Sequence, residues 1–464
     1  MKHVHFLGIC GTAMGAVASA MARKGYTVTG SDANVYPPMS TFLESEGIQI
    51  FQGYKASNIP EDADLIVIGN AMSRGNAEVE AVLEKNLRYM SLPETMKEFF
   101  LWGKKNFVVT GTHGKTTTTS MLTWIMKDND LDPGFMIGGI ARNLGCGGHF
   151  TDSEYCVLEG DEYDTAFFDK RSKFLHYLPK VVIINNIEMD HADIYANVEE
   201  IKLSFKRLLR VVPKDGVVFI NADCPNCADV KAHAAEELRM VKIVSIGMSE
   251  DADLRITNID YHTDGSDFVM DGEPYYVPMV GDFNIRNAAM AVSAARFAGI
   301  SPEKIRASLN EFQGVARRQE VRGCVHSVTV VDDFAHHPTA IKQAVQALRQ
   351  RFPKCRLWVL FDPRSNTTIR NIFQHELAEA LATADFAVLS PVENHKKVAP
   401  EERLNEEQLK ADIAAAGTEC YLGTGVDDIV AHVVARVHPG DVLLVMSNGG
   451  FGGIHGKLLA ALAQ

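Results

Sequence analysis

The sequence lacks several features that would place it in a membrane, fibrous or nucleic-acid-binding class. No run approaches the roughly 18 consecutive apolar residues of a membrane-spanning helix, and the chain has no low-complexity tract, collagen-like period or block of like charge. Acidic residues outnumber basic ones, and the formal net charge is -13. This charge argues against a protein held on nucleic acid by phosphate contacts. Small anionic ligands stay possible, because converging backbone N–H groups can outweigh a negative global charge.

Cysteine pairs suited to a disulfide framework or a structural zinc site are scarce. Only Cys224 and Cys227 have the Cys-X-X-Cys spacing of metal or redox motifs, and no second pair completes a four-ligand zinc site. Reduced thiols in a cytoplasm are therefore expected. The eight cysteines are Cys10, Cys146, Cys156, Cys224, Cys227, Cys324, Cys355 and Cys420.

The apolar segment at residues 4–22 imitates a secretory signal peptide. Gly8, Gly11 and Gly15 interrupt it, however, and residues 26–32 then have the pattern of a strand. A strand, a glycine turn, a helix and a second strand explain the segment better. We therefore predict a cytoplasmic protein without a membrane segment.

The length of 464 residues predicts about three domains, and short β-branched runs alternate with helical patterns throughout. That alternation is typical of parallel α/β layers. We predict three domains, at residues 1–101, 102–313 and 314–464, and a strand-rich insertion at 242–278. The predicted strands are 4–7, 26–32, 64–68, 106–110, 155–158, 181–184, 217–220, 328–331, 356–361, 386–389 and 442–446.

The strongest motif is the segment Thr-Gly-Thr-His-Gly-Lys-Thr-Thr at 110–117, which lies between a predicted strand and a predicted helix. Glycine lets the backbone curl closely around a phosphate, so that several N–H groups converge on it. Lys115 would bring a positive charge to the outer phosphates, and Thr116 a hydroxyl to magnesium. Val109 stands where the general P-loop has its first glycine. A glycine-rich structural turn is the alternative interpretation.

A second glycine cluster, Gly-Ile-Cys-Gly-Thr-Ala-Met-Gly at 8–15, also joins a strand to a helix. It resembles a dinucleotide fingerprint, with Asp32 about where a ribose-binding carboxylate would lie. Cys10 and Ala13 replace two of the three fingerprint glycines. The cluster therefore indicates a diphosphate-containing ligand at the helix N-terminus, not specifically a nicotinamide cofactor. A turn that only packs helix on strand remains the alternative.

Two polar clusters follow predicted strands of the central block, at 159–164 and at 186–191. In a parallel sheet both would lie at the carboxyl edge, beside the phosphate loop. Their hard oxygen atoms suit magnesium, which also retains water and substrate phosphates as ligands. A solvated acidic loop is the competing interpretation of either cluster alone.

Six segments in order make the chain similar to the Mur ligase family, which builds the peptide of bacterial peptidoglycan. The similarity spans essentially the whole chain, and the N-terminal glycine cluster resembles the branch that acts on UDP-N-acetylmuramic acid. The segments are GTHGKTTT at 111–118, GDEYD at 160–164, NIEMDH at 186–191, GDFNIRNAAMA at 281–291, FQGVARRQE at 312–320 and DDFAHHP at 332–338.

The resemblance implies an N-terminal Rossmann-like domain for the UDP substrate, a central P-loop ATPase-type domain and a C-terminal Rossmann-like domain for the amine. It also implies ATP and two magnesium sites. Catalytic roles would fall to Lys115, Glu162, His191 and Arg318, and metal contacts to Thr116, Glu162 and His191. ATP would contact Gly111, Thr112, His113, Gly114, Lys115, Thr116, Thr117, Asn284, Asn287, Arg318 and Asp333. The UDP substrate would contact Gly8, Cys10, Gly11, Thr12, Asp32 and Ser73.

Without the resemblance, Asn284 and Asn287 would be interpreted as a surface pair at helical spacing, and Arg317-Arg318 as a solvated linker. Relatives in the family carbamylate a lysine that supports magnesium. Lys206 lies near the corresponding position, but the flanking residues align Phe205 there, so Lys206 is not assigned.

Two branches of the family fit the N-terminal motif, one adding L-alanine and one adding a recovered tripeptide of L-alanine, D-glutamate and diaminopimelate. The segment at 361–371 and the segment at 160–174 resemble the tripeptide branch. Arg364 and Arg370 could bind the several carboxylates of a tripeptide bidentately, with Ser365 and Asn366 as neutral donors. The alternatives at this point are a basic loop at a helix start and the alanine-adding branch.

Two other classes compete with a ligase. A nicotinamide-dependent oxidoreductase would use the first glycine cluster but would leave Lys115 and the central block unexplained. A nucleotide-switched binding protein would use the phosphate loop without synthesis. UDP-N-acetylmuramate and the tripeptide are the expected substrates, with no nucleic-acid or membrane partner, and the sequence does not report the oligomeric state.

Overall fold

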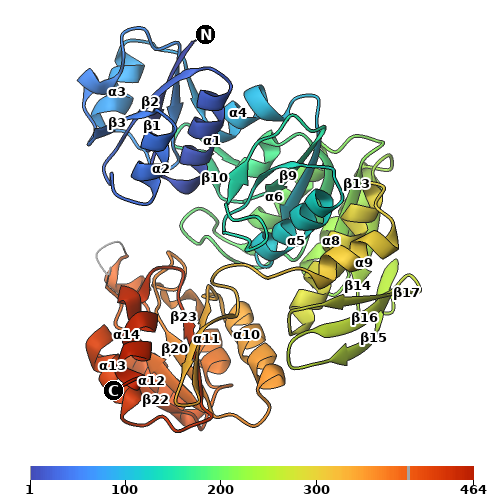
Figure 1. Cartoon of the computed structure of the whole chain (residues 1–464), viewed down its shortest axis with the longest axis vertical. Coiled ribbons are helices and arrows are strands. Elements are labelled where there is room, and N and C mark those ends of the chain that lie inside the picture. The colour runs from blue at the N-terminus through green and yellow to red at the C-terminus, as the bar shows by residue number, and fades with distance from the viewer. Residues whose placement is uncertain (1, 394–397) are drawn as a thin grey trace. The chain divides into compact units, whose positions relative to one another are not determined.

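The computed structural model describes residues 2–393 and 398–464 (Figure 1). By their internal contacts these residues divide into two compact units. The first unit contains residues 2–188, 198–255 and 289–308, and the second contains residues 189–197, 256–288 and 309–464. Within these described residues, every helix is too short or too polar to cross a bilayer. The predicted strands are all present, with ends within two residues of the predicted ones.

The N-terminal sheet has five parallel strands in the order β3-β2-β1-β4-β5. The chain order reverses between β1 and β4, and ligands of open α/β sheets bind at such a switch point, beyond the carboxyl ends of the strands. The strands are β1 (His3–Leu7), β2 (Thr27–Asp32), β3 (Gln49–Gln52), β4 (Leu65–Ile68) and β5 (Tyr89–Ser91), and the helices are α1 (Thr12–Arg23), α2 (Met39–Ser45), α3 (Ala77–Glu84) and α4 (Leu92–Met96).

The central sheet within the first unit has the order β14-β13-β12-β6-β9-β7-β8. Its middle strands are parallel and buried, as expected for a sheet with helices on both faces. The strands are β6 (Lys105–Thr110), β7 (Gly134–Met136), β8 (Gly148–His149), β9 (Tyr155–Glu159), β12 (Pro179–Ile184), β13 (Val217–Asn221) and β14 (Lys242–Gly247), and the helices are α5 (Lys115–Asp128), α6 (Val198–Leu209), α7 (Pro225–Glu237) and α9 (Pro302–Asn310).

The insertion predicted at 242–278 is confirmed for its later part only, because β14 at its start pairs in parallel with β13 of the central sheet. The rest forms an antiparallel meander. It consists of β15 (Leu254–Tyr261), which begins in the first unit, followed by β16 (Ser266–Met270) and β17 (Glu273–Val277). Helix α8 (Asp282–Phe297) follows it and ends in the first unit. A separate hairpin is formed by β10 (Asp164–Ala166) and β11 (Asp169–Ser172).

The C-terminal sheet has the order β18-β19-β23-β20-β21-β22, in which only β18 is antiparallel to its neighbour. Its strands are β18 (Glu320–Val325), β19 (Val328–Asp333), β20 (Leu357–Phe361), β21 (Phe386–Leu389), β22 (Glu419–Leu422) and β23 (Val442–Met446), and its helices are α10 (Pro338–Arg351), α11 (Gln374–Leu381), α12 (Glu406–Ala415), α13 (Val426–Val434) and α14 (Ile454–Leu462).

Two hydrophobic cores cover the two faces of this C-terminal sheet. Alternate residues of β20 point to opposite faces: Val359 packs with the helices α10, α11 and α12, whereas Trp358 packs with α13 and α14. Trp358 also stacks on Phe386, with ring centroids 4.1 Å apart. The α/β class with three parallel sheets, predicted from the sequence, is confirmed.

Candidate active site

The phosphate-loop motif forms a tight turn between β6 and α5, as predicted. Gly111 has φ +122°, and a Cβ there would lie 2.9 Å from the backbone N and O of Asn186, so only glycine fits. Gly114 is left-handed, with φ +80°, and caps α5 without a side chain. No side chain caps the first N–H groups of this helix. Uncapped N–H groups at a helix N-terminus are the arrangement that binds phosphate.

The loop after β12 holds the phosphate loop in place. The carbonyl of Asn186 accepts a hydrogen bond from the N–H of Thr112 (3.1 Å), and its side-chain oxygen accepts one from the N–H of His113 (2.7 Å). The N–H of Glu188 donates to Thr112 Oγ1 (2.9 Å), and Asn185 Nδ2 donates to Thr118 Oγ1 (3.0 Å). The start of the second polar cluster is thus part of the phosphate-loop scaffold.

Lys115, the first residue of α5, forms an ion pair with Glu162 from the loop after β9. Lys115 Nζ lies 2.9 Å from Glu162 Oε2 and 3.1 Å from Oε1. The side chains are 13% and 1% exposed. Burial opposes the charge of Lys115, but the carboxylates of Glu162 and Asp161 outweigh it and raise the pKa of the ammonium above its usual value. The lysine is therefore charged, and its ammonium group is held against Glu162.

Thr116 contacts a second carboxylate, that of Glu159 at the end of β9. Thr116 Oγ1 donates to Glu159 Oε1 (3.0 Å), and the N–H of Gly138 donates to Glu159 Oε2 (2.6 Å). Hydroxyl and carboxylate oxygens are the donors that magnesium prefers, so Thr116 with Glu159 and Glu162 fits that ion chemically. Glu159 belongs to the acidic cluster at 159–164 that the sequence singled out for magnesium, but it was not named among the predicted site residues.

His191 lies in the segment 189–197, which belongs to the second unit. It adopts a left-handed conformation, with φ +52°. The neighbouring Asp190 accepts a hydrogen bond from Thr367 Oγ1 (2.8 Å). Burial favours its neutral form, but the charges of His191, His336 and His337 lower the pKa of Asp190 well below its usual range. The carboxylate of Asp190 is therefore stabilised by the charges of three nearby histidines.

Asn284 and Asn287 lie on α8 and are 1% and 4% exposed. The interpretation of this pair as a surface feature is therefore wrong. Asn284 Nδ2 donates to the carbonyl of Val280 (2.9 Å), and Asn287 Nδ2 donates to Asn284 Oδ1 (3.3 Å). This side of α8 is packed against other residues. Buried amide groups need hydrogen-bond partners, and these two bonds provide them.

The Arg317-Arg318 pair is not a solvated linker, so that interpretation is also wrong. Arg317 Nη2 donates to the carbonyls of Ser447 and Gly449, at 2.6 Å each. The Arg318 guanidinium lies 4.9 Å from the ring centroid of Phe334. Asp333, at the end of β19, accepts the N–H of Gln319 (2.8 Å). Its burial raises the pKa of the carboxyl despite the nearby charge of Arg318.

In the N-terminal sheet, the glycine turn at 8–11 follows β1 and Asp32 ends β2, so both lie at the carboxyl edge. The N–H of Cys10 donates to Asp32 Oδ2 (2.9 Å), and the N–H of Asn34 donates to Asp32 Oδ1 (2.9 Å). Asp32 therefore fixes the shape of the turn from which α1 begins at Thr12. Ser73 is exposed in the turn after β4, at the same edge.

Arg364, Ser365, Asn366 and Arg370 all lie in the loop after β20. Arg364 is 43% exposed, and its Nη1 lies 3.7 Å from Glu393 Oε2. Arg370 donates to Glu402 Oε2 (2.6 Å). Ser365 bonds with Thr368 (2.9 Å between the hydroxyls), and Asn366 Nδ2 donates to Asp193 Oδ2 (3.0 Å). The loop is thus ordered by its own polar contacts, with Arg364 the more exposed cation.

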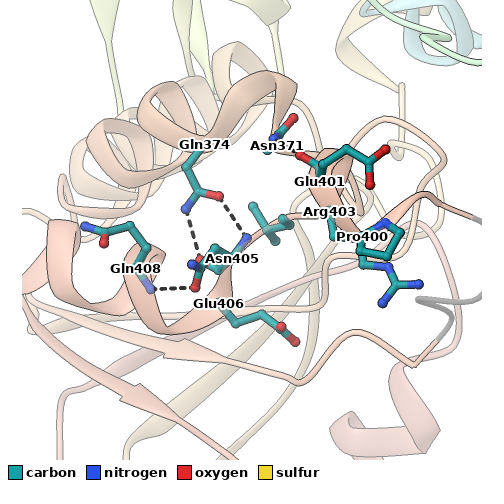
Figure 2. A pocket seen from close by; sticks show the side chains of 9 residues that line it. Asn371, Gln374, Pro400, Glu401, Arg403, Asn405, Glu406 and Gln408 are labelled. Carbon is teal, nitrogen blue, oxygen red and sulfur yellow. Dashed lines mark hydrogen bonds between the residues drawn. The ribbon is translucent and has the colours of Figure 1, made fainter.

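A pocket of about 620 Å³ lies beside Arg370, between the starts of α11 and α12. Figure 2 shows Gln374, the first residue of α11, bonded to Asn405, the cap of α12. Its lining is mostly polar and comes from the segments after β20 and β21 and from the first turns of α11 and α12. The lining residues are Asn371, Gln374, Pro400, Glu401, Arg403, Leu404, Asn405, Glu406 and Gln408.

Comparison with protein families matches three models in succession along the chain. The Mur ligase family, catalytic domain, matches residues 3–101. The Mur ligase middle domain matches residues 109–295, and the Mur ligase, glutamate ligase domain, matches residues 317–449. The three matches together cover most of the chain.

Relatives with curated names are similar over the full length. The UDP-N-acetylmuramate–L-alanyl-γ-D-glutamyl-meso-2,6-diaminoheptandioate ligase of Haemophilus influenzae is 42% identical, covering 100% of this chain and 99% of its own. The UDP-N-acetylmuramate–L-alanine ligase of Dictyoglomus turgidum is 31% identical, covering 99% and 97%. The crystal structure of a murein peptide ligase from Psychrobacter arcticus has a TM-score of 0.72 and 36% identity, covering 100% and 99%.

Replacing Gly111 with alanine should disable the phosphate loop, because the new Cβ would meet the Asn186 backbone. The control is Gly103→Ala, where φ is also positive (+76°) but nothing lies within 4 Å. We expect Gly103→Ala to cost about 1 kcal/mol of unfolding free energy, and Gly111→Ala to cost more and to abolish ATP binding. Calorimetric titration with Mg-ATP, beside thermal unfolding, measures both. Normal ATP affinity in Gly111→Ala would contradict the assigned loop.

Replacing Lys115 with alanine removes the cation expected at the outer phosphates. We expect ATP-dependent phosphate release to fall by about 10²–10³-fold, while circular dichroism shows an intact fold. The control is Lys105→Ala, which removes an exposed ion pair with Glu154 at the other end of β6 and should leave the rate unchanged. Near-normal phosphate release by Lys115→Ala would remove this residue from the site.

Proposed function

Because the chain belongs to the Mur ligase family, we propose that it is the ATP-dependent enzyme that joins the tripeptide L-alanyl-γ-D-glutamyl-meso-diaminopimelate to UDP-N-acetylmuramate. The reaction forms an amide bond and returns a recovered murein peptide to peptidoglycan metabolism. The observation that carries the assignment is the 42% identity over the full length with a ligase named for this tripeptide, against 31% with a ligase named for L-alanine.

The chemical problem is that a carboxylate resists attack by an amine. Transfer of the γ-phosphoryl group of ATP to the lactyl carboxylate of UDP-N-acetylmuramate gives an acyl phosphate, in which phosphate is a good leaving group. The amino group of the tripeptide then attacks the carbonyl carbon, and phosphate departs as the amide forms. The phosphoryl oxygens carry negative charge throughout, so the site must present fixed positive charge to them.

Lys115 is positioned to supply that charge. In the structure it lies against Glu162, so binding of the triphosphate exchanges one anionic partner for another without moving the lysine out of its buried position. The N–H groups at the start of α5 bind the phosphates, because Gly111 and Gly114 place no side chain at the two positions where the backbone curls most closely. The Asn186 contacts keep the turn in this shape, so little reorganisation is needed when ATP binds.

The family uses magnesium together with ATP. When bound, the metal neutralises phosphate charge and polarises the phosphoryl group. We propose that Thr116, Glu159 and Glu162 hold one ion, and that Glu162 and His191 hold a second one near the γ-phosphate and the substrate carboxylate. The oxygen donors described above suit this ion. His191 follows Glu188 by three residues in the chain, and the Glu188 N–H donates to Thr112 of the phosphate loop.

The remaining binding roles are proposals of the same kind. Asn284 and Asn287 contact the adenine, whereas Arg318 and Asp333 contact the nucleotide from the C-terminal domain. Closing of that domain would exclude water, which would otherwise hydrolyse the acyl phosphate. We also propose that the domains are divided at 1–101, 102–313 and 314–464 and that the enzyme works in the cytoplasm, where ATP is available. The UDP group is assigned to Gly8, Cys10, Gly11, Thr12, Asp32 and Ser73.

A direct assay of the amine substrate tests the function. With ATP, magnesium and UDP-N-acetylmuramate present, we expect phosphate to be released at a high rate only when the tripeptide is added. Mass spectrometry should identify the UDP-muramyl tripeptide as the product. Turnover with L-alanine but not with the tripeptide would assign the chain to the alanine-adding branch. Phosphate release that is indifferent to any amine would indicate a nucleotide switch instead.

Replacing Arg364 with alanine tests the peptide-binding loop. Loss of a charge-assisted contact with a tripeptide carboxylate should raise the KM for the tripeptide by about 10–100-fold and leave the KM for ATP unchanged. The control is Arg436→Ala, because Arg436 has similar exposure (42%) and an ion pair with Glu419 in the same domain. An unchanged tripeptide KM in Arg364→Ala would show that this contact does not exist.

A further inference from the structure

Cys224 and Cys227 form a dithiol at the start of helix α7, and the mechanism above makes no use of it. Cys224 is the N-cap residue, with extended backbone angles, and Pro225 begins the helix. This places Cys227 in the first turn, one turn along from Cys224. Cys224 is 8% exposed and Cys227 is fully buried. No disulfide joins them in the structure.

The two thiols differ in their readiness to ionise. A hydrogen bond from the Cys227 thiol, helped by the N–H of Ile187, lowers the pKa of Cys224 to about 6, against the opposing effect of burial. Burial, together with Cys224, raises the pKa of Cys227 well above its usual value. Cys224, at 8% exposure, is the more accessible of the two sulfurs. An acidic thiol at a helix N-terminus with a second, fully buried thiol one turn along is the layout of Cys-X-X-Cys redox pairs.

The dithiol is also attached to the scaffold of the phosphate loop. The N–H of Ile187 points at Cys224 Sγ (3.5 Å), and Asn226, between the two cysteines, donates to the carbonyl of Ile187 (2.8 Å). Asn221, just before the motif, donates to the carbonyl of Asn185 (2.7 Å). The residue enclosed by these contacts is Asn186, which holds the N–H groups of Thr112 and His113.

We propose that Cys224 and Cys227 are a reversible oxidation site, at which a peroxide converts the two thiols into an intramolecular disulfide and thereby weakens ATP binding. The proposal depends on the phosphate loop as the ATP site and not on the identity of the amine substrate. It also gives a role to the one cysteine pair whose sequence spacing is that of a redox motif.

The reaction balances with one peroxide. The Cys224 thiolate attacks a peroxide oxygen, the O–O bond breaks, and Cys224 becomes a sulfenic acid while the other oxygen leaves as an alcohol or as water. The Cys227 sulfur then attacks Cys224 Sγ, the S–O bond breaks, and water leaves as the disulfide forms. Two thiols are oxidised and one peroxide is reduced. A dithiol reductant reverses the change by thiol–disulfide exchange.

The expected effect on ATP follows from the contacts at Ile187. A disulfide removes the negative charge on Cys224 that the Ile187 N–H faces and draws Cys224 Sγ toward Cys227. The backbone at 185–187 then loses part of its support, and Asn186 holds the phosphate loop less firmly. Weakening one or two hydrogen bonds corresponds to a rise of about 3–10-fold in the Kd for ATP.

The test uses the full chain carrying Cys146→Ser and Cys324→Ser, which removes the two exposed cysteines so that intermolecular disulfides do not interfere. After treatment with hydrogen peroxide, intact mass should decrease by two hydrogen atoms, and peptide mapping should locate a disulfide between Cys224 and Cys227. The Kd for a fluorescent ATP analogue should rise as stated and should return to its initial value with dithiothreitol.

Adding Cys227→Ser to this background provides the matched control. Its Cys224 should stop at the sulfenic acid and be trapped by dimedone, without a disulfide, and circular dichroism checks the fold. Absence of the Cys224–Cys227 disulfide in the parent would overturn the proposal, as would a disulfide that leaves the ATP Kd unchanged. Because nucleotide binding is measured directly, a failed amide-bond assay would not affect this result.

Discussion

The ion pair between Lys115 and Glu162 is the interaction on which the rest of the site depends. Both groups are removed from water, where an isolated charge would be costly, and each is stabilised by the other. A lysine held in this way is already charged, oriented and desolvated when a triphosphate arrives. The binding of ATP and metal can then redistribute existing charges, with the lysine turning to phosphate and the carboxylate to the metal.

The sheet order explains why residues far apart in sequence meet at this point. Strands β12, β6 and β9 are adjacent and parallel, so the loops that follow them share one edge. One loop carries the phosphate-binding turn, one carries Glu162, and one carries Asn186. The sequence predicted this much, because strand–glycine–helix patterns and polar residues at strand ends are local signals that parallel topology brings together.

Other parts of the site depend on contacts that no local pattern reports. The role of Asn186 as a support of the phosphate loop follows from the close approach of its backbone to Gly111 in the folded sheet. The bond of Asp32 to the Cys10 N–H has the same origin. Arg317 looked like a solvated residue because its carbonyl partners lie more than a hundred positions away, and the helical spacing of Asn284 and Asn287 does not reveal which side of α8 is packed.

The most direct test of the central claim is a crystal structure of the protein with magnesium and a non-hydrolysable ATP analogue. The account predicts that Lys115 Nζ leaves Glu162 and contacts the outer phosphates, that the α5 N-terminus binds the same phosphates, and that Glu162 becomes part of the metal's shell. A nucleotide bound elsewhere, with Lys115 still paired to Glu162, would contradict it.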